Sequence, residues 1–246
     1  MFGFGPTSTD FTVSHDSQPS DTLLVGFSQF GLAGLTAVDY LVEHLDLTQQ
    51  GHITAEGLDP ITPFVEGRPR HPIRLYSRDD LNVTVLVCEQ FVPASAGATL
   101  SEAILDWTAD NGVEEIAVLS GVPVPHGPED HRTYYIATDD YHQRRLAGRE
   151  IPAMGNGFLS GVNAALVEQG LDSPLGVGLY VTPVHARAPD VDAGIRLLET
   201  VNEVYDLGVD TEPLRGFASE VQQYYSELAQ RMERTAEEEP EDRMYM

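Results

Sequence analysis

The sequence predicts an α/β fold, a three-layer sandwich in which helices cover a mixed or mainly parallel central sheet. Short runs of branched and aliphatic residues alternate along the chain with stretches that have helical periodicity. The 246 residues are also enough to bury a sizeable core in one domain of this class. We therefore expect a single α/β domain over residues 21–236, with an N-terminal segment over 1–20 and an acidic flexible tail over 237–246.

The first half of the alternation begins with a buried strand. "DTLLVGF" (21–27) predicts this strand, and the apolar spacing in "GLAGLTAVDYLVEHL" (31–45) predicts a helix. Three more strands are predicted over "HITAEGL" (52–58), "PIRLYS" (72–77) and "NVTVLVCEQ" (82–90), with a turn at Arg78-Asp79-Asp80. A helix over 100–111 ends at Asn111-Gly112.

The second half continues in the same way. "EIAVLSGV" (115–122), "RTYYIAT" (132–138) and "LGVGLYV" (175–181) predict strands, while "FLSGVNAALVEQG" (158–170) and "DVDAGIRLLETVNEVYDL" (190–207) predict helices. A last helix is expected after Pro213. This helix carries an apolar stripe of four residues, Phe217, Val221, Tyr224 and Leu228. The stripe either packs on the protein's own core or forms a subunit contact. Beyond Pro240 the chain is too polar to fold alone.

The charge is strongly acidic. The formal net charge is −25, and all 14 basic residues are arginine. Like charge of this size repels itself in dilute buffer, but at molar salt the Debye length falls to about 3 Å and screens the repulsion. The composition indicates a halophile, with an ordinary acidic mesophilic protein as the alternative. It opposes nucleic-acid binding, which needs a basic patch.

The single cysteine, Cys88, lies inside a predicted strand, so no internal disulfide is expected and a reducing compartment fits. The N-terminus has neither a basic region nor a long apolar run, and no stretch is long enough to span a membrane. We expect a cytoplasmic protein, and no cofactor or metal is predicted.

Three sets of residues are candidates for chemistry. Gly26, Gly31 and Gly34 lie between a strand and a helix, where backbone N–H groups bind anions, although close strand-to-helix packing explains them equally well and the sequence is not a P-loop. The loop "PVPHGPEDHRTYY" contains His126, Glu129, Asp130 and His131, at a spacing not typical of metal ligands; a solvated loop is the simpler interpretation.

The third set comprises possible nucleophiles. Ser28, Ser95 and Ser120 lie near predicted strand ends, but none is in a G-x-S-x-G motif. Cys88 has no base beside it in the sequence, which favours a small core residue. No catalytic constellation is predicted, and an enzyme remains an alternative.

Residues 20–210 resemble the proteasome assembly chaperone 2 family. The resemblance rests on four motifs in order: the glycine turn at Gly26, Gly31 and Gly34, the strand entry from Gly112 to Gly121, the helix start at 157–161, and Pro189-Asp190 before a helix. It implies an α/β protein of phosphorylase/hydrolase-like fold without established catalysis. It also implies a homo-oligomer that binds the proteasome core particle.

The C-terminal residues "MYM" fit this resemblance. Met244-Tyr245-Met246 looks like the hydrophobic-tyrosine-any-residue motif that proteasome activators insert between α-subunits of the core ring. Tyrosine supplies rigid apolar area, methionine adapts to a groove, and a terminal carboxylate pairs with a lysine. The alternative is that these residues fold back onto their own domain.

Two functions follow. The first is an assembly chaperone-like or activator-like protein that docks on the core particle through its tail. The second is a phosphorylase- or hydrolase-type enzyme for a small anionic or nucleoside substrate, with the glycine turn binding the anion and the His126 to His131 loop moving protons. A single tail should bind at about millimolar affinity, so tail docking also predicts an oligomer.

Overall fold

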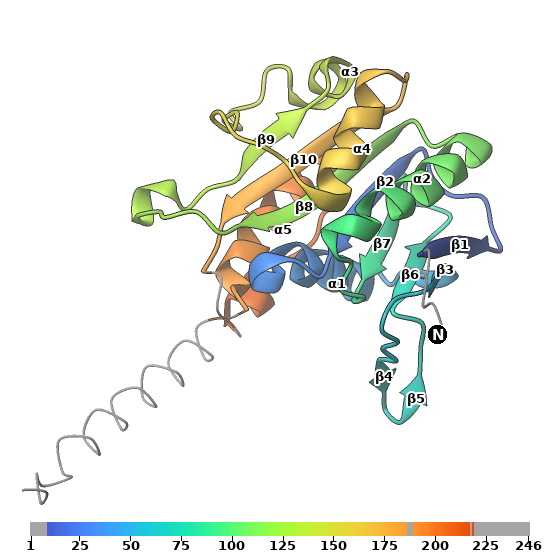
Figure 1. Ribbon diagram of the computed structural model, residues 1–246. Coiled ribbons are helices and arrows are strands. Elements are labelled where there is room, and N and C mark those ends of the chain that lie inside the picture. The colour runs from blue at the N-terminus through green and yellow to red at the C-terminus, as the bar shows by residue number, and fades with distance from the viewer. Residues whose placement is uncertain (1–8, 186–188, 217, 219–246) are drawn as a thin grey trace, which may run out of the picture. The chain divides into compact units, whose positions relative to one another are not determined.

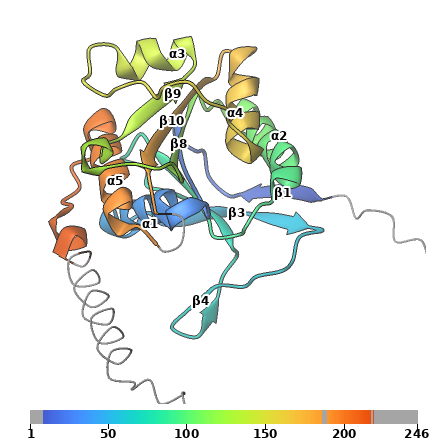
Figure 2. The ribbon, with the colours of Figure 1, turned by 60° about the vertical axis from the view of Figure 1, so that its left-hand side comes forward.

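The computed structural model describes residues 9–185, 189–216 and 218. The chain divides into two compact units, Met1–Val209 and Asp210–Met246. The first unit is a mixed α/β structure whose eight-stranded sheet has helices on both faces (Figure 1, Figure 2). This confirms the predicted α/β class with a mixed sheet.

The strands of the main sheet lie in the order β1-β3-β6-β7-β2-β8-β10-β9. Four of them are parallel neighbours, β7, β2, β8 and β10, and the strands outside these four pair antiparallel. Their bounds are β1 (Asp10–His15), β2 (Thr22–Phe27), β3 (Thr48–Glu56), β6 (Ile73–Ser77), β7 (Thr84–Cys88), β8 (Glu115–Val122), β9 (Tyr134–Ala137) and β10 (Gly176–Pro183). Coverage on both faces explains why β2 and β10 are apolar and buried along their whole length.

Helices pack in pairs on the two faces of this sheet (Figure 2). α1 (Ala33–His44) and α5 (Val191–Tyr205) pack together on one face, and α2 (Ala94–Asn111) and α4 (Gly161–Leu171) on the other. One part of the core lies under α2 and α4, where Leu100, Ile104 and Leu166 pack with the inward side chains of the strands. Shorter turns are α3 (Asp139–Tyr141), the 3-10 turns Phe30–Leu32 and Pro128–Asp130, and the π turn His142–Leu146.

The parallel strands of the sheet end along one side and begin along the opposite side. We call the edge at which β2, β7, β8 and β10 end the carboxyl edge, and the opposite one the amino edge. Ile73 of β6 lies opposite Cys88 of β7, and β3 runs antiparallel to β6, so the connection from β3 to β6 also lies at the carboxyl edge. That connection forms a second sheet of two short strands, β4 (Phe64–Val65) and β5 (Arg68–Pro69).

Three predicted boundaries were wrong and one strand was missed. β3 begins at Thr48, four residues before the predicted start at 52. β1 was missed inside the predicted N-terminal segment, and α2 begins at Ala94, six residues before the predicted start at 100. The early turns of α2 consist of small residues because they lie against another backbone: a Cβ on Gly97 would lie 2.6 Å from the amide nitrogen of Val162. α4 begins only at Gly161, so Phe158 lies outside it.

The second unit is described only at its start. Residues 212–216 and 218 are helical, which agrees with a helix beginning near Pro213. The stripe residue Phe217 and those from Val221 onward, like the tail over 237–246, lie outside the described residues. Within the described part of the chain, no helix has both the length and the apolar character needed to cross a membrane.

Candidate functional site

The glycine turn brings α1 close to the sheet. A Cβ on Gly34 would lie 1.9 Å from the carbonyl oxygen of Leu119 in β8, and a Cβ on Gly26 would lie 2.5 Å from the carbonyl oxygen of Gly34. Gly31 has a φ of +66°, in the left-handed region where a side chain is strained. Close packing and turn geometry therefore account for all three glycines, and anion binding at this turn stays a prediction.

The predicted proton-transfer residues lie in the loop after β8, namely His126, Glu129, Asp130 and His131. The ring of His126 lies 5.1 Å from that of His131 and 4.9 Å from that of His185, measured between ring centroids. The Asp130 carboxylate accepts a hydrogen bond of 3.1 Å from the Gly127 amide, which fixes the turn. Across the described residues, no three His, Cys, Asp or Glu side chains are arranged to hold a metal ion.

Ser120 is buried in a hydrogen-bonded group of three polar side chains. Its hydroxyl donates to Gln29 Oε1 at 2.8 Å, and the amide of Asn163 donates to the same oxygen at 3.0 Å. The group contains no histidine or carboxylate that would take a proton from the serine. Ser28 follows β2 and Ser95 lies in the first turn of α2, and neither belongs to this hydrogen-bonded group.

Cys88 is wholly buried in β7, which confirms its interpretation as a core residue. Burial raises the pKa of its thiol to about 12, so the thiolate that nucleophilic chemistry requires is not populated at neutral pH.

Exposed apolar side chains gather at the carboxyl edge. Eight large apolar residues of the described chain are exposed, and seven of them lie in connections at this edge. We call these seven the carboxyl-edge surface: Phe30, Ile61, Phe64, Val65, Phe91, Val124 and Phe158. Scattered exposed apolar residues are ordinary, but their concentration on one edge is typical of a protein-docking surface.

The β4–β5 arm, residues 61–70, is the most prominent part of this surface and projects beyond the main sheet (Figure 1). Phe64 is 73% exposed and Val65 is 50% exposed. The turn at Glu66-Gly67 has positive φ at both residues, the conformation that closes a two-residue hairpin. The sequence carried a signal for this arm, since "FVEGRP" places two apolar residues before a Gly-containing turn.

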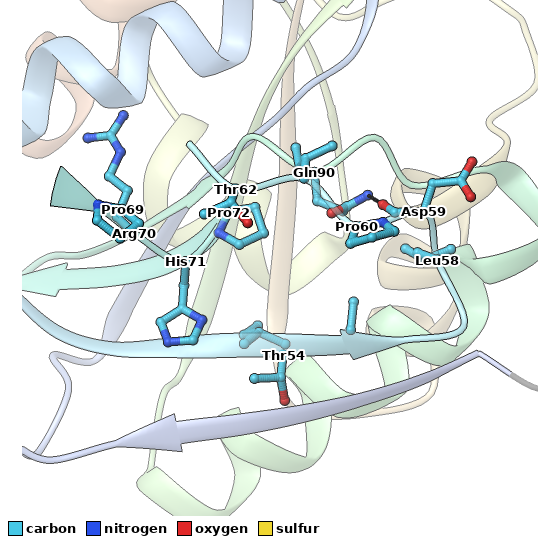
Figure 3. A pocket seen from close by; sticks show the side chains of 13 residues that line it. Thr54, Leu58, Asp59, Pro60, Thr62, Pro69, Arg70, His71, Pro72 and Gln90 are labelled. Atoms are coloured by element: carbon cyan, nitrogen blue, oxygen red, sulfur yellow. Dashed lines mark hydrogen bonds between the residues drawn. The ribbon is translucent and has the colours of Figure 1, made fainter. Parts of the chain in front are cut away.

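A pocket of about 410 Å³ opens at the base of the arm (Figure 3). Its walls come from the end of β3 and from the proline-rich residues on both sides of the arm, including Pro60, Pro69 and Pro72. His71 points toward β3, where its ring stacks on His52 at 3.7 Å between centroids. The prolines hold the base of the arm in a restricted backbone conformation.

An ion-pair network lies beside this pocket. Glu89 accepts hydrogen bonds from Arg70 at 2.8 Å and from Arg74 at 2.5 Å, and the Arg74 side chain has no exposed area. Nearby, burial raises the pKa of the Asp39 carboxyl to about 6, and the negative charge of Glu89 adds to the increase. Arg70 and Arg74 are paired with Glu89. The network therefore stabilises the strand ends beside the pocket, and none of these three charges is left available for catalysis.

The predicted docking residues, Met244, Tyr245 and Met246, lie outside the described residues. The described part of the chain thus presents exposed apolar residues at the carboxyl edge, and the candidate nucleophiles Ser120 and Cys88 have no base beside them in it. Comparison with known proteins bears on what such a surface is for. A model of the PAC2 family matches residues 23–229.

The chain belongs to the PAC2 family.

Sequence and structure comparisons agree with this membership. An uncharacterized protein of Methanocaldococcus jannaschii is 24% identical over 212 residues, which are 85% of each chain. The structure of Pyrococcus furiosus PbaA, described as an archaeal homolog of proteasome-assembly chaperone, matches with a TM-score of 0.81 and 19% identity, over 93% of this chain and 94% of that one. P. furiosus PbaB, described as an archaeal proteasome activator, matches with a TM-score of 0.72 and 16% identity, over 89% and 99%.

At these identities the structural matches establish that this PAC2 chain has the fold of the archaeal proteins. They include both a chaperone homolog and an activator, so the fold is compatible with either role. The phosphorylase/hydrolase-like description of the fold stays a prediction.

Proposed function

We propose that this chain binds the proteasome core particle through Met244, Tyr245 and Met246, acting as an assembly chaperone-like or activator-like protein. The observation that carries the proposal is a hydrophobic-tyrosine-any-residue sequence in a chain of the PAC2 family. Met244 is the hydrophobic member, Tyr245 the aromatic anchor, and the Met246 carboxylate the group that pairs with a lysine of the α-ring.

The acidic residues before this motif act as a solvated spacer. Residues 237–242 carry five carboxylates and no cation, so they do not adhere to an acidic surface. Apolar burial of Met244 and Tyr245 stabilises the complex even at molar salt, at which ion pairs are largely screened. This suits the cytoplasm of a halophile, where we place the protein.

The affinity of one tail is low. Burial of the methionine and tyrosine side chains yields about 1.5 to 3 kcal/mol each, and a carboxylate pair adds about 1 to 3 kcal/mol, before the cost of association. Several tails on one homo-oligomer bind together, which raises the affinity by about a hundredfold or more when their spacing matches the ring. We therefore propose a homo-oligomer as the functional form.

The enzyme alternative finds little support. The glycine turn is explained by packing, Ser120 lacks a base, and Cys88 is buried with its pKa raised. The ring of His126 lies near the rings of His131 and His185. A search for enzymatic turnover would begin with variants of these histidines.

The proposal is tested by pull-down of an archaeal core particle at molar KCl. We expect the full chain to capture the particle, and both Tyr245→Ala and a chain truncated after Arg243 to lose capture while the far-UV circular dichroism spectrum stays unchanged. Glu241→Gln, which changes the spacer and not the motif, is the matched control and should bind as the full chain does. Full capture by the truncated chain contradicts the proposal.

A second measurement separates the two roles. If the protein is activator-like, the mature core particle should hydrolyse peptides faster in the complex than alone. Accumulation of assembly intermediates when the protein is removed from cells, without any effect on hydrolysis, indicates a chaperone.

A further inference from the structure

A hollow at the amino edge could receive an arm such as the β4–β5 arm at the carboxyl edge. There a hollow of about 680 Å³ lies between the ends of α2 and α4 and the starts of β8 and β10. We call it the amino-edge hollow, and its apolar lining includes Leu105, Ala109, Val113, Pro174 and Leu175. The eighth exposed apolar residue, Leu171, is 69% exposed and lies between two residues of the lining, Gln169 and Ser173.

The arm has the residue types that bind a partner protein. It presents Phe64 and Val65 to solvent on a two-stranded hairpin, and hairpins of this size are at best marginally stable in water without a partner. The Arg68 side chain has no hydrogen-bond or ion-pair partner among the described residues, although its neighbour Arg70 is paired with Glu89. Aromatic residues and arginine are both enriched at protein interfaces.

The rim of the hollow carries complementary charge. Asp106 is exposed and has no ion-pair partner in the described chain, and Glu114 also lines the hollow. The one arginine of the lining, Arg144, lies 3.4 Å from Glu115 and 3.7 Å from Glu114, so its charge is already compensated. Since Arg144 compensates Glu114 as well, Asp106 is the acidic group of this lining left unpaired. An apolar lining with this carboxylate is the complement of an apolar tip with a free cation.

We propose that the arm of one copy of this chain inserts Phe64 and Val65 into the amino-edge hollow of a second copy, with Arg68 facing Asp106. A second copy is favoured as occupant because the tip and the hollow of the same chain are complementary: Phe64, Val65 and the Arg68 cation match an apolar lining that holds the unpaired Asp106. The general repulsion between two acidic copies is screened at molar salt. Because the arm and the hollow lie on opposite edges, the contact is head-to-tail and generates a ring or a filament.

This contact deepens the proposed function, since it supplies the homo-oligomer on which multivalent tail docking rests. It does not involve the tail, so the two are tested separately. The readout is molecular mass by size-exclusion chromatography with light scattering, on the full-length chain at molar KCl.

We expect wild type to be oligomeric, and both Phe64→Asp and Ala109→Trp to lose the oligomer and elute at monomer mass. The first variant removes the apolar tip and the second fills the hollow. Phe158→Asp is the matched control, because it removes an even more exposed phenylalanine of the carboxyl-edge surface outside the arm, and it should keep the wild-type mass. Wild-type mass for the Phe64→Asp chain, or dissociation by Phe158→Asp alone, overturns the proposal.

Mixing tests the head-to-tail geometry. Phe64→Asp retains a working hollow, and Ala109→Trp retains a working arm, so the two monomeric variants should combine into a heterodimer with one intact contact. A contact that pairs like surfaces, arm with arm or hollow with hollow, leaves one of the two variants oligomeric on its own and gains nothing from mixing. Two monomers in the mixture overturn the head-to-tail arrangement.

Exchange of the two charges tests the pairing of Arg68 with Asp106. Recovery in the double variant also shows that the single variants do not lose association through misfolding. At the lowest KCl concentration at which every variant keeps the far-UV circular dichroism spectrum of wild type, Arg68→Glu and Asp106→Arg should each weaken association at least tenfold, and the double variant should recover most of the loss. Absence of recovery overturns the Arg68–Asp106 pairing. A monomeric wild type overturns both this contact and the oligomer of the proposed function, whereas an oligomer that fails to capture the core particle contradicts tail docking alone.

Discussion

Arg74 donates a hydrogen bond of 2.5 Å to Glu89 from a side chain that has no exposed area. A second hydrogen bond, from Arg74 Nε, reaches the Tyr76 hydroxyl at 2.7 Å, and a third reaches the backbone carbonyl of His71 at 2.5 Å. A buried guanidinium is stable only when such partners replace water. Arg74 therefore links β6 to the end of β7 and to the residue that follows the β4–β5 arm.

Replacing Arg74 by methionine should lower the free energy of unfolding by about 3 kcal/mol. The change leaves the Tyr76 hydroxyl without its partner and removes one of two cations from Glu89. Urea denaturation of the two proteins measures the difference.

The control is Arg215→Met, because Arg215 and Glu212 form an exposed pair with side chains 50% and 81% accessible. Its effect should stay within about 1 kcal/mol. Equal losses for the two variants would show that Arg74 has no special structural role.

The Asp39 carboxyl predicts an unusual pH dependence. Its folded pKa is about 6, above the ordinary value of 3.8, so between these two values the folded chain binds more protons than the unfolded chain. The contribution of Asp39 to stability therefore falls as pH rises from about 3.8 to about 6, by up to about 3 kcal/mol in total.

Asp39→Asn should remove this loss. Plotted against pH, the unfolding free energy of wild type minus that of the variant should decline across this window and level off above it. Asp80→Asn serves as the comparison, because its hydrogen bond with Arg78 lowers the pKa of the Asp80 carboxyl and reverses the sign. A difference curve for Asp39→Asn that is flat or rises with pH would exclude a raised pKa.

Much of this architecture follows from local patterns. β2, β8 and β10 are mainly apolar because both faces of these strands are covered, and such stretches stand out in the sequence. The arm was not predicted, since each of its strands has two residues and prolines surround it. Its position beside the ends of β2 and β7 depends on strand order, which involves contacts between residues distant in the chain.

The candidate site was less predictable than the fold. The sequence indicated that Gly26, Gly31 and Gly34 form a turn. The short distances from Gly34 to Leu119 and from Gly26 to Gly34, which decide their packing role, required the structure. Similarly, "PIRLYS" predicts a strand without indicating that its arginine is wholly buried. Burial of a charge depends on partners such as Glu89 that come from another strand.

Gly34 should be intolerant of any side chain. Since a Cβ would lie 1.9 Å from the Leu119 carbonyl oxygen, Gly34→Ala must push α1 away from β8 and should cost about 3 kcal/mol of stability. Gly155→Ala is the matched control, because nothing lies within 4 Å of its added Cβ. Thermal unfolding should shift down only for the first variant, and unchanged stability of Gly34→Ala would mean that α1 does not lie this close to the sheet.

The charge of −25 predicts that the chain needs salt to remain folded. In dilute buffer the carboxylates repel one another across a Debye length of about 30 Å, whereas at molar salt this length is about 3 Å. The unfolding temperature should thus rise from low to molar KCl, and NaCl should act equally if screening is the cause. A variant with Glu56, Glu102 and Glu150 changed to glutamine loses three exposed charges and should reach the same unfolding temperature at a lower salt concentration. If the unfolding temperature falls with salt, or the variant needs as much salt as wild type, then repulsion between surface carboxylates does not limit the stability of this protein.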